Sequence, residues 1–318
     1  MRKLSTKMLL GIGCAAIFAA IAIFVSCRSE SKQALDETPT RGDIKISVDE
    51  SYQPIIDSEI FVFSRYYQYA NITPRYKPEV DIINDFMNDS VKLIITNKQL
   101  TEEQIKTLRD TLIIARTTAF AFDAIALIVN KENRDTILTY QQVKDIFLGN
   151  IKTWKDIKPN SKLDKISVVF DNTKSGNVRY FKEKFEIATQ LPENFYAVNT
   201  NEEVINFISK NRNALGIISV NWISDKDDPQ SRKFTNGIRV MAISPFYDNT
   251  SFYLPEQGAI YNKSYPFTRE VYLISRETFA GLGSGFVQWV THDQGQRIIL
   301  KSGLVPSVSP IRLIQVKH

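Results

Sequence analysis

Hydrophobic and polar residues alternate along the chain in blocks that predict strands followed by helices. Helical spacing appears, for example, at Ile55, Ile56, Ile60 and Phe63. Alternating strands and helices are typical of an α/β architecture. Short apolar runs predict a strand that ends at residue 170 and further strands over residues 44–49, 91–96, 124–130, 214–220 and 271–275.

Threonines placed three residues before a glutamine or a glutamate predict the start of three helices. These capping boxes are Thr101–Gln104, Thr139–Gln142 and Thr200–Glu203. In each box, two side chains pair backbone N–H groups that the first helical turn leaves free. Gly149 is placed to end the second of these helices.

Three turns share one design, in which a buried strand leads through a short polar turn into a helix. They follow Val48, Ile95 and Phe170. In open α/β sheets, ligands bind at the carboxyl ends of the strands, where several helix N-termini converge. The first N–H groups of a helix and the positive end of its dipole favour an anion. If the three turns meet, we expect them to surround one small, multivalent anion.

The third of these turns runs from Asp171 to Gly176. Apolar residues resume after it at Val178, Phe181 and Phe185, and this spacing predicts a helix that starts at the turn. The alternative is an ordinary capped turn between a strand and a helix, which binds nothing.

The N-terminal residues predict a membrane-targeting segment. Arg2, Lys3 and Lys7 precede a long apolar run that ends at Cys27, where the chain becomes polar. The run resembles a lipoprotein signal sequence, in which residues 1–26 are removed and Cys27 carries the lipid. The alternative is an uncleaved transmembrane helix. Both hypotheses place the rest of the chain outside the cytoplasmic membrane.

The polar residues 27–42 lack hydrophobic periodicity, so we expect a flexible tether there. The formal net charge of the chain is +5, and three of the positive charges lie within residues 1–26. Removing them leaves +2, which is weak evidence for a nucleic-acid partner. We therefore expect no nucleic acid among the partners.

Cysteine and histidine are scarce, which excludes several kinds of chemistry. The cysteines are Cys14 and Cys27, and the histidines are His292 and His318. These counts do not fit a disulfide framework, a cysteine- or histidine-based metal site, or a histidine-dependent catalytic triad. We expect no metal, no cofactor and no enzymatic activity.

Three longer motifs resemble a known family. They are LTYQQVKDIFLGNIKTWKDI (138–157), YPFTREVYLIS (265–275) and GQRIILKSGLVP (295–306). Together they resemble the PstS-type phosphate-binding proteins of ABC phosphate transporters. The resemblance implies a two-lobed periplasmic binding protein-like fold of type II, with a two-strand hinge and a ligand cleft between the lobes. The implied lobes are residues 43–122 with 240–318, and residues 123–239.

The resemblance also implies which residues bind the ligand. Members of the family hold phosphate through side-chain hydroxyls, backbone N–H groups, an arginine and an aspartate. By position, the expected ligand-binding residues here lie in the three turns and at the start of the helix that follows the third: Ser51, Thr96, Asn97, Lys98, Asp171, Ser175, Gly176, Asn177 and Arg179.

The sequence departs from the family at three of these positions. Asn177 replaces the usual threonine, the second turn lacks the family's aspartate, and no arginine directly precedes Ser175. The aspartate matters because it accepts the proton of monohydrogen phosphate, which sulfate does not have. The residues that remain to supply the carboxylate are Asp49, Asp123 and Asp171, and those that remain to supply the positive charge are Lys98, Lys174 and Arg179.

The resulting hypothesis is a monomeric protein on the periplasmic side of the cell envelope, lipid-anchored to a membrane. It would bind inorganic phosphate and deliver it to an ABC permease. Two alternatives stay open, namely binding of another oxyanion and a sensor or structural role on the same fold.

Overall fold

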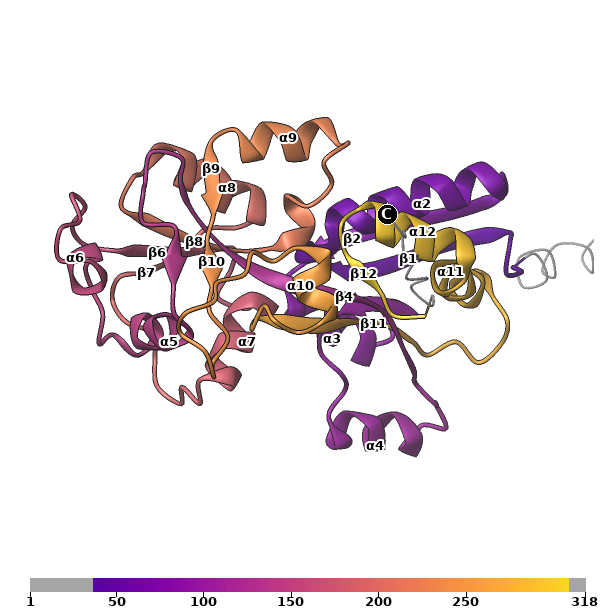
Figure 1. Ribbon diagram of the computed structural model, residues 1–318. Helices are drawn as coiled ribbons and strands as arrows, with labels where there is room; N and C mark the ends of the chain where they lie inside the picture. Colours follow the sequence, from indigo (N-terminus) through magenta and orange to yellow (C-terminus); the bar gives the residue numbers. More distant parts are fainter. Residues whose placement is uncertain (1–36, 309–318) are drawn as a thin grey trace, which may run out of the picture.

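The computed structural model describes residues 37–308, which form a mixed α/β protein with one large, curled sheet (Figure 1). The strands are β1 (Gly42–Asp49), β2 (Ala70–Lys77), β3 (Leu93–Thr96), β4 (Arg116–Asn130), β5 (Ile137–Leu138), β6 (Ser167–Phe170), β7 (Phe195–Ala197), β8 (Ala214–Ser219), β9 (Ile238–Val240), β10 (Ala242–Ile243), β11 (Thr268–Ser275) and β12 (Val305–Pro306). The helices are α2 (Gln53–Tyr66), α3 (Glu79–Met87), α4 (Glu102–Asp110), α5 (Tyr140–Leu148), α6 (Trp154–Ile157), α7 (Gly176–Lys184), α8 (Asn201–Lys210), α9 (Pro229–Thr235), α10 (Gln257–Tyr261), α11 (Leu282–Thr291) and α12 (Asp293–Lys301), with the short 3-10 helices η1 (Glu50–Tyr52) and η2 (Val220–Trp222).

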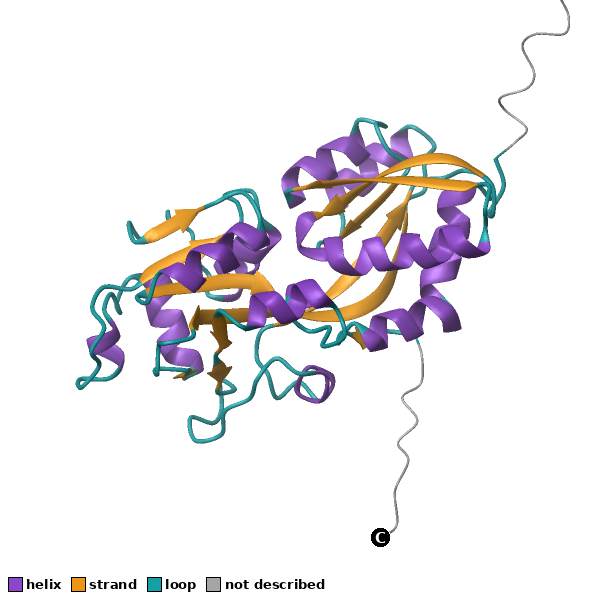
Figure 2. Cartoon of the chain, turned by 90° about the horizontal axis from the view of Figure 1, so that it is seen from above, coloured by secondary structure: helices purple, strands orange, loops and turns teal. Residues whose placement is uncertain are grey.

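Strand β4 connects two parts of the sheet. The strand order is β2-β1-β3-β11-β4-β8-β6-β7. The half of β4 up to Ala124 pairs antiparallel with β11, whereas Ile125–Val129 pairs antiparallel with β8. Seen from above, the elements gather into two groups that β4 joins (Figure 2). We call β1, β2, β3 and β11 with their helices the first group, and β6, β7 and β8 with their helices the second group.

Parallel pairing determines where the three turns begin. In the first group, β1 runs parallel to both β2 and β3. In the second group, β6 runs parallel to both β7 and β8. Because parallel strands end at the same edge of a sheet, the turns after β1 and β3 start next to each other. The residues that precede the three turns, Val48, Ile95 and Phe170, are all buried.

Most of the predicted elements are confirmed, with one clear difference in length. Strand β4 begins at Arg116, eight residues before the predicted start at residue 124. Its first residues are exposed or half-buried and become buried only from Phe120 on. The continuous apolar run that identified the strand therefore marks only its buried half.

Two of the three predicted capping boxes are complete. Thr101 and Thr139 each accept from the backbone N–H three residues later, and the glutamine there accepts in return. Gly149 ends α5 with a positive φ of 76°. The third box is only half formed, because Glu203 accepts from the backbone N–H of Asn199 instead of that of the cap residue.

The predicted signal sequence and Cys27 lie outside the described residues. Residues 37–41, which the sequence assigned to the tether, pack on α11: Glu37 accepts from the backbone N–H of Leu282 at 3.1 Å. Thr38 and Arg41 form an isolated bridge next to them. Over residues 37–308, no helix is long and apolar enough to cross a membrane.

Candidate ligand-binding site

The three turns that were predicted to meet are in contact. A long hydrogen bond of 3.4 Å from Asn177 Nδ2 to Ser51 Oγ links the start of α7 to the turn after β1. The turn after β3 reaches both, because Asn97 Nδ2 lies 3.5 Å from Asp49 Oδ2 and Asn97 Oδ1 accepts from the Arg179 guanidinium. The carboxyl ends of β1, β3 and β6 therefore converge on the N-terminus of α7.

The start of α7 is built around a serine cap. Ser175 Oγ accepts from the backbone N–H of Asn177 at 3.0 Å, and its hydroxyl donates to Asp171, whose two oxygens lie 2.6 and 2.7 Å away. Asn177 Nδ2 also donates to Asp171 Oδ1, at 3.2 Å. All three residues are buried. Because one carboxyl group holds both polar side chains, the turn between β6 and α7 has a fixed shape.

Gly176 is where the first group touches the helix backbone. A β-carbon there would lie 2.6 Å from Asn97 Nδ2, 2.8 Å from Glu79 Oε2 and 3.0 Å from Asp49 Oδ2. Glycine is the residue that leaves room for this approach. Polar side chains from three other segments thus lie directly against the end of α7 that carries the unpaired N–H groups.

The turn after β1 also reaches a second helix N-terminus, that of α8. The carboxylate of Glu50 accepts from the backbone N–H of Asn201, at 3.1 and 3.2 Å to its two oxygens, and from the Asn201 side-chain amide. The backbone carbonyl of Ser51 accepts from Asn221 Nδ2 at 3.1 Å. The short helix η1 is therefore bonded to the second group on two sides.

Acidic side chains outnumber basic ones around these turns. The four most deeply placed acids are at most 4 % exposed. A fifth acid is partly buried, and two arginines are the basic residues that hydrogen-bond within this set. The acids are Asp49, Glu50, Glu79, Asp123 and Asp171, and the arginines are Arg179 and Arg269.

Burial changes the protonation of these acids. It raises the pKa of Asp49 to about 7, and the nearby charge of Glu79 raises it as well. It raises the pKa of Glu50 to about 8. Burial also raises the pKa of Asp123 and of Asp171. Asp49 and Glu50 are therefore largely or partly protonated near neutral pH. Their protonation reduces the repulsion among the acids and between the acids and an anion.

The expected ligand-binding residues divide into three sets. Thr96 is buried, and its hydroxyl accepts from the backbone N–H of Lys98 at 3.1 Å, so it shapes the second turn. Lys98 and Arg179 line an open groove of about 600 Å³ along α7. The other six residues lie where the three turns meet: Ser51, Asn97, Asp171, Ser175, Gly176 and Asn177. Contact of any of the nine with a ligand stays a prediction.

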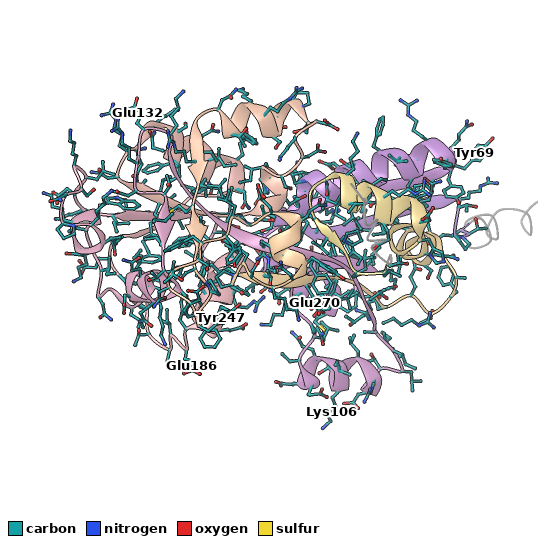
Figure 3. The ribbon with its side chains drawn as sticks, in the orientation of Figure 1. Tyr69, Lys106, Glu132, Glu186, Tyr247 and Glu270 are labelled. Atoms are coloured by element: carbon teal, nitrogen blue, oxygen red, sulfur yellow. The ribbon has the colours of Figure 1, made fainter. Side chains whose placement is uncertain are left out.

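Sequence reasoning missed Arg269, although its motif contains a signal. In "TREVYLIS", Arg269 takes one of the alternating positions of β11 that face the core, and it is buried. The neighbouring Glu270 is exposed (Figure 3). An arginine at an inward position of a strand indicates a buried partner. Also missed were Glu50, Tyr52, Glu79, Asn201, Ser219 and Asn221.

The fold is similar to those of solved phosphate-transport proteins. One is the crystal structure, with bound phosphate, of a candidate phosphate ABC transporter substrate-binding protein from Clostridium perfringens. It has a TM-score of 0.70 at 22% identity and covers 83% of this chain and 99% of that chain. An ABC-type phosphate transport receptor from Vibrio cholerae has a TM-score of 0.61 at 19% identity, covering 83% and 99%. These similarities establish a periplasmic binding protein-like fold.

The chain belongs to the PBP superfamily, whose domain model matches residues 34–294. The phosphate-binding protein PstS of Staphylococcus epidermidis is 22% identical over 285 residues, covering 88% of this chain and 84% of that protein. PstS of Borreliella burgdorferi is 20% identical over 293 residues, covering 89% and 94%. The resemblance to PstS-type proteins is thereby confirmed.

Proposed function

We propose that the protein is a lipid-anchored, extracytoplasmic binding protein for inorganic phosphate, which it delivers to an ABC permease. It acts as a monomer, without turnover, and holds its ligand in a cleft between two lobes. In this proposal the lobes are residues 43–122 with 240–318 and residues 123–239, and Cys27 carries the lipid. The names of the curated relatives and the function of the solved neighbours support the proposal.

The observation that carries the proposal is the convergence on the N-terminus of α7. Ser51 and Asn97 from the first group meet Ser175, Gly176 and Asn177 of the second group. Hydroxyls, side-chain amides and helix N–H groups all donate hydrogen bonds, and the helix dipole adds positive potential. Such a set suits a small oxyanion that offers acceptors in several directions.

The energetics permit this function without a metal. Micromolar binding needs about 8 kcal/mol. A hydrogen bond to a charged group contributes about 1.5–3 kcal/mol. A handful of aligned donors therefore suffices, even after the entropy lost on association is subtracted.

The buried acids support phosphate as the ligand. Monohydrogen phosphate carries a proton that an ionised carboxylate accepts, whereas sulfate carries none. Asp49, Asp123 and Asp171 are all buried in this region. In this proposal one of them takes the part of the aspartate that the second turn lacks; Asp171 is the one bonded directly to Ser175 and Asn177.

The excess of acids over arginines also favours a second candidate function. If most of the carboxyl groups are ionised, an anion is repelled, and the fold then serves as a sensor or structural protein. If fewer of the carboxyl groups are ionised, the site could also accept an oxyanion that carries no proton. Both candidates share the fold; the first differs from the proposal in its role and the second in its ligand.

Isothermal titration of the full-length protein in detergent, freed of carried-over phosphate, tests the proposal. We expect phosphate to bind with micromolar or better affinity and sulfate to give no heat of binding. Binding of both anions would replace phosphate by an unselective oxyanion site. Binding of neither would support the sensor or structural role.

A further inference from the structure

Two of the three cations that the sequence offers for this site, Lys174 and Arg179, bind acids of the chain itself, and the third, Lys98, lines the open groove along α7. Lys174 Nζ lies 2.8 Å from Asp81 Oδ1 on the surface. Arg179 donates to Glu79 through Nε and Nη2 and to Glu183 through Nη1. Most of its donors are therefore used by acids of the chain itself. These three residues therefore place no unpaired cation among the buried groups around η1.

Arg269 is buried where the two groups meet. On β11 it stands directly opposite Asp123 of β4. Its Nε donates to Asp123 Oδ2 at 2.9 Å, and its Nη2 lies 2.8 Å from the same oxygen. Its guanidinium carbon lies 5.4 Å from the centre of the Tyr52 ring. Asp123 and Tyr52 thus fix the plane of the guanidinium beside η1.

The outer nitrogens of Arg269 are unused donors. Within residues 37–308, neither Nη1 nor Nη2 makes a hydrogen bond of good geometry, although Nη2 is close to Asp123. An arginine offers five N–H donors in a rigid fork. Among the described residues, the Nε–H is the one that makes a hydrogen bond of good geometry, and Nη2 shares its ion pair with Asp123. A buried polar group without a partner costs about 1–3 kcal/mol, so this arrangement needs a reason.

Other unpartnered polar atoms lie in the same place. Among the described residues, the Tyr52 hydroxyl and the side-chain amide oxygens of Asn177 and Asn221 also lack a hydrogen bond of good geometry. Tyr52 belongs to η1, and Asn177 and Asn221 both donate to Ser51 of η1. Four chain segments therefore direct unused polar atoms to the surroundings of one short helix.

We propose that Arg269 binds the anion directly and is the cation that the turn before α7 lacks. This inference rests on the proposed function. The planar fork of a guanidinium matches two oxygens of a tetrahedral oxyanion and binds them through paired, charge-assisted hydrogen bonds. Asp123 is a positioning residue, since it holds Nε and leaves both Nη groups for the ligand.

Charge supports the same assignment. The positive charge of Arg269 lowers the pKa of both Asp49 and Asp171, against the effect of burial, so it lies near both acids. A cation between the turn after β1 and the turn after β6 offsets the repulsion that these acids exert on a phosphate.

The test replaces Arg269 and a matched arginine by lysine in the full-length protein and measures phosphate binding by titration calorimetry. Arg276 is the matched control: it is also buried, it also lies over an aromatic ring, that of Phe86, at 5.7 Å, and it donates to a backbone carbonyl away from the site. We expect Arg269→Lys to weaken phosphate binding by about 10- to 100-fold, because a lysine lacks the fork. Arg276→Lys should leave the affinity within about twofold while lowering thermal stability.

Three outcomes separate the inference from the proposed function. If the unaltered protein binds no phosphate, both fail. If it binds phosphate and folded Arg269→Lys binds equally well, the inference alone is overturned. If Arg269→Lys does not fold, the double variant Arg269→Met with Asp123→Leu decides, because it removes the buried pair together and leaves no unpaired charge. A folded double variant with unaltered phosphate affinity would also overturn the inference.

Discussion

The N-termini of α7 and α8 meet the same short segment, η1, in different ways. At α8, Glu50 of η1 accepts from the backbone and the side chain of Asn201, so a carboxyl group of the chain itself bonds to the helix end. At α7, the Ser51 hydroxyl makes only one long contact with Asn177. Among the described residues, the side-chain amide oxygen of Asn177 lacks a hydrogen-bond partner, and the outer nitrogens of Arg269 lack one too.

This difference assigns a separate role to each helix end. A helix N-terminus whose first N–H group already bonds to a carboxyl group of the chain has fewer donors left for an external anion, and it serves to fix η1 to the second group. At α7 a neutral serine hydroxyl accepts from the first-turn backbone N–H of Asn177, so the positive potential of this helix end remains available to an external anion. We therefore interpret α8 as the structural contact of η1 and α7 as its ligand-binding contact.

The largest expected effect comes from filling the space at the start of α7. Gly176→Ala would place a methyl group 2.6–3.0 Å from three polar side chains of the first group. These side chains would have to move away from the helix end, and the loss of two or so charge-assisted hydrogen bonds weakens phosphate binding by about 100-fold. Titration calorimetry measures this loss.

Gly258→Ala, in α10, is the matched control because a β-carbon there meets nothing within 4 Å. Its phosphate affinity should equal that of the unaltered protein. Unchanged affinity in folded Gly176→Ala would show that α7 is not the ligand-binding helix end.

A smaller effect distinguishes the caps of the two helices. Ser175 and Thr200 each accept from a backbone N–H in the first turn, at 3.0 and 3.1 Å. Replacing either by alanine removes a cap and costs about 1 kcal/mol of stability. Ser175→Ala should also weaken phosphate binding by about tenfold, through the loss of one hydrogen bond to a charged ligand.

Thr200→Ala should lower the thermal midpoint without changing phosphate affinity. Equal affinities of the two variants would contradict the separate roles of α7 and α8. Chemical denaturation and titration calorimetry, run on the same preparations, give both quantities.

Local patterns were sufficient to predict many of the strands and helices, although β2 and α3 were missed. Apolar runs, helical spacing and threonine caps depend on neighbours in the sequence, and these predictions are confirmed for β1, α2, α5 and α7. The exposed half of β4 was missed because its first residues are not an apolar run. Pairing across a sheet, here with β11, decided that part of the strand.

The site was predicted where chain order shows it and missed where only folding brings residues together. Ser51, Asn97 and Ser175 stand in turns after apolar strands, so their convergence followed from the rule for α/β sheets. Arg269 lies nearly a hundred residues after Ser175, on a strand that enters the sheet antiparallel. Its place beside Tyr52 depends on that pairing, which no local pattern encodes.

The smallest expected effect concerns the α8 contact. It is a change in the stability of the fold with pH, and phosphate affinity is not expected to change. Burial raises the pKa of Glu50 from an ordinary 4.5 to about 8, so the folded chain holds this proton more tightly than the unfolded chain. The stability that Glu50 provides is therefore complete below pH 4.5 and is lost as the pH rises towards 8.

Glu50→Gln has no proton to lose, so its thermal midpoint should fall less between pH 5 and pH 8, by about 2–4 °C for each kcal/mol concerned. Glu203→Gln, at an exposed position of α8, should keep the pH dependence of the unaltered protein. Parallel curves for Glu50→Gln and the unaltered protein would show that Glu50 is ionised in its contact with Asn201, and the α8 contact would then resemble an ordinary capped helix end.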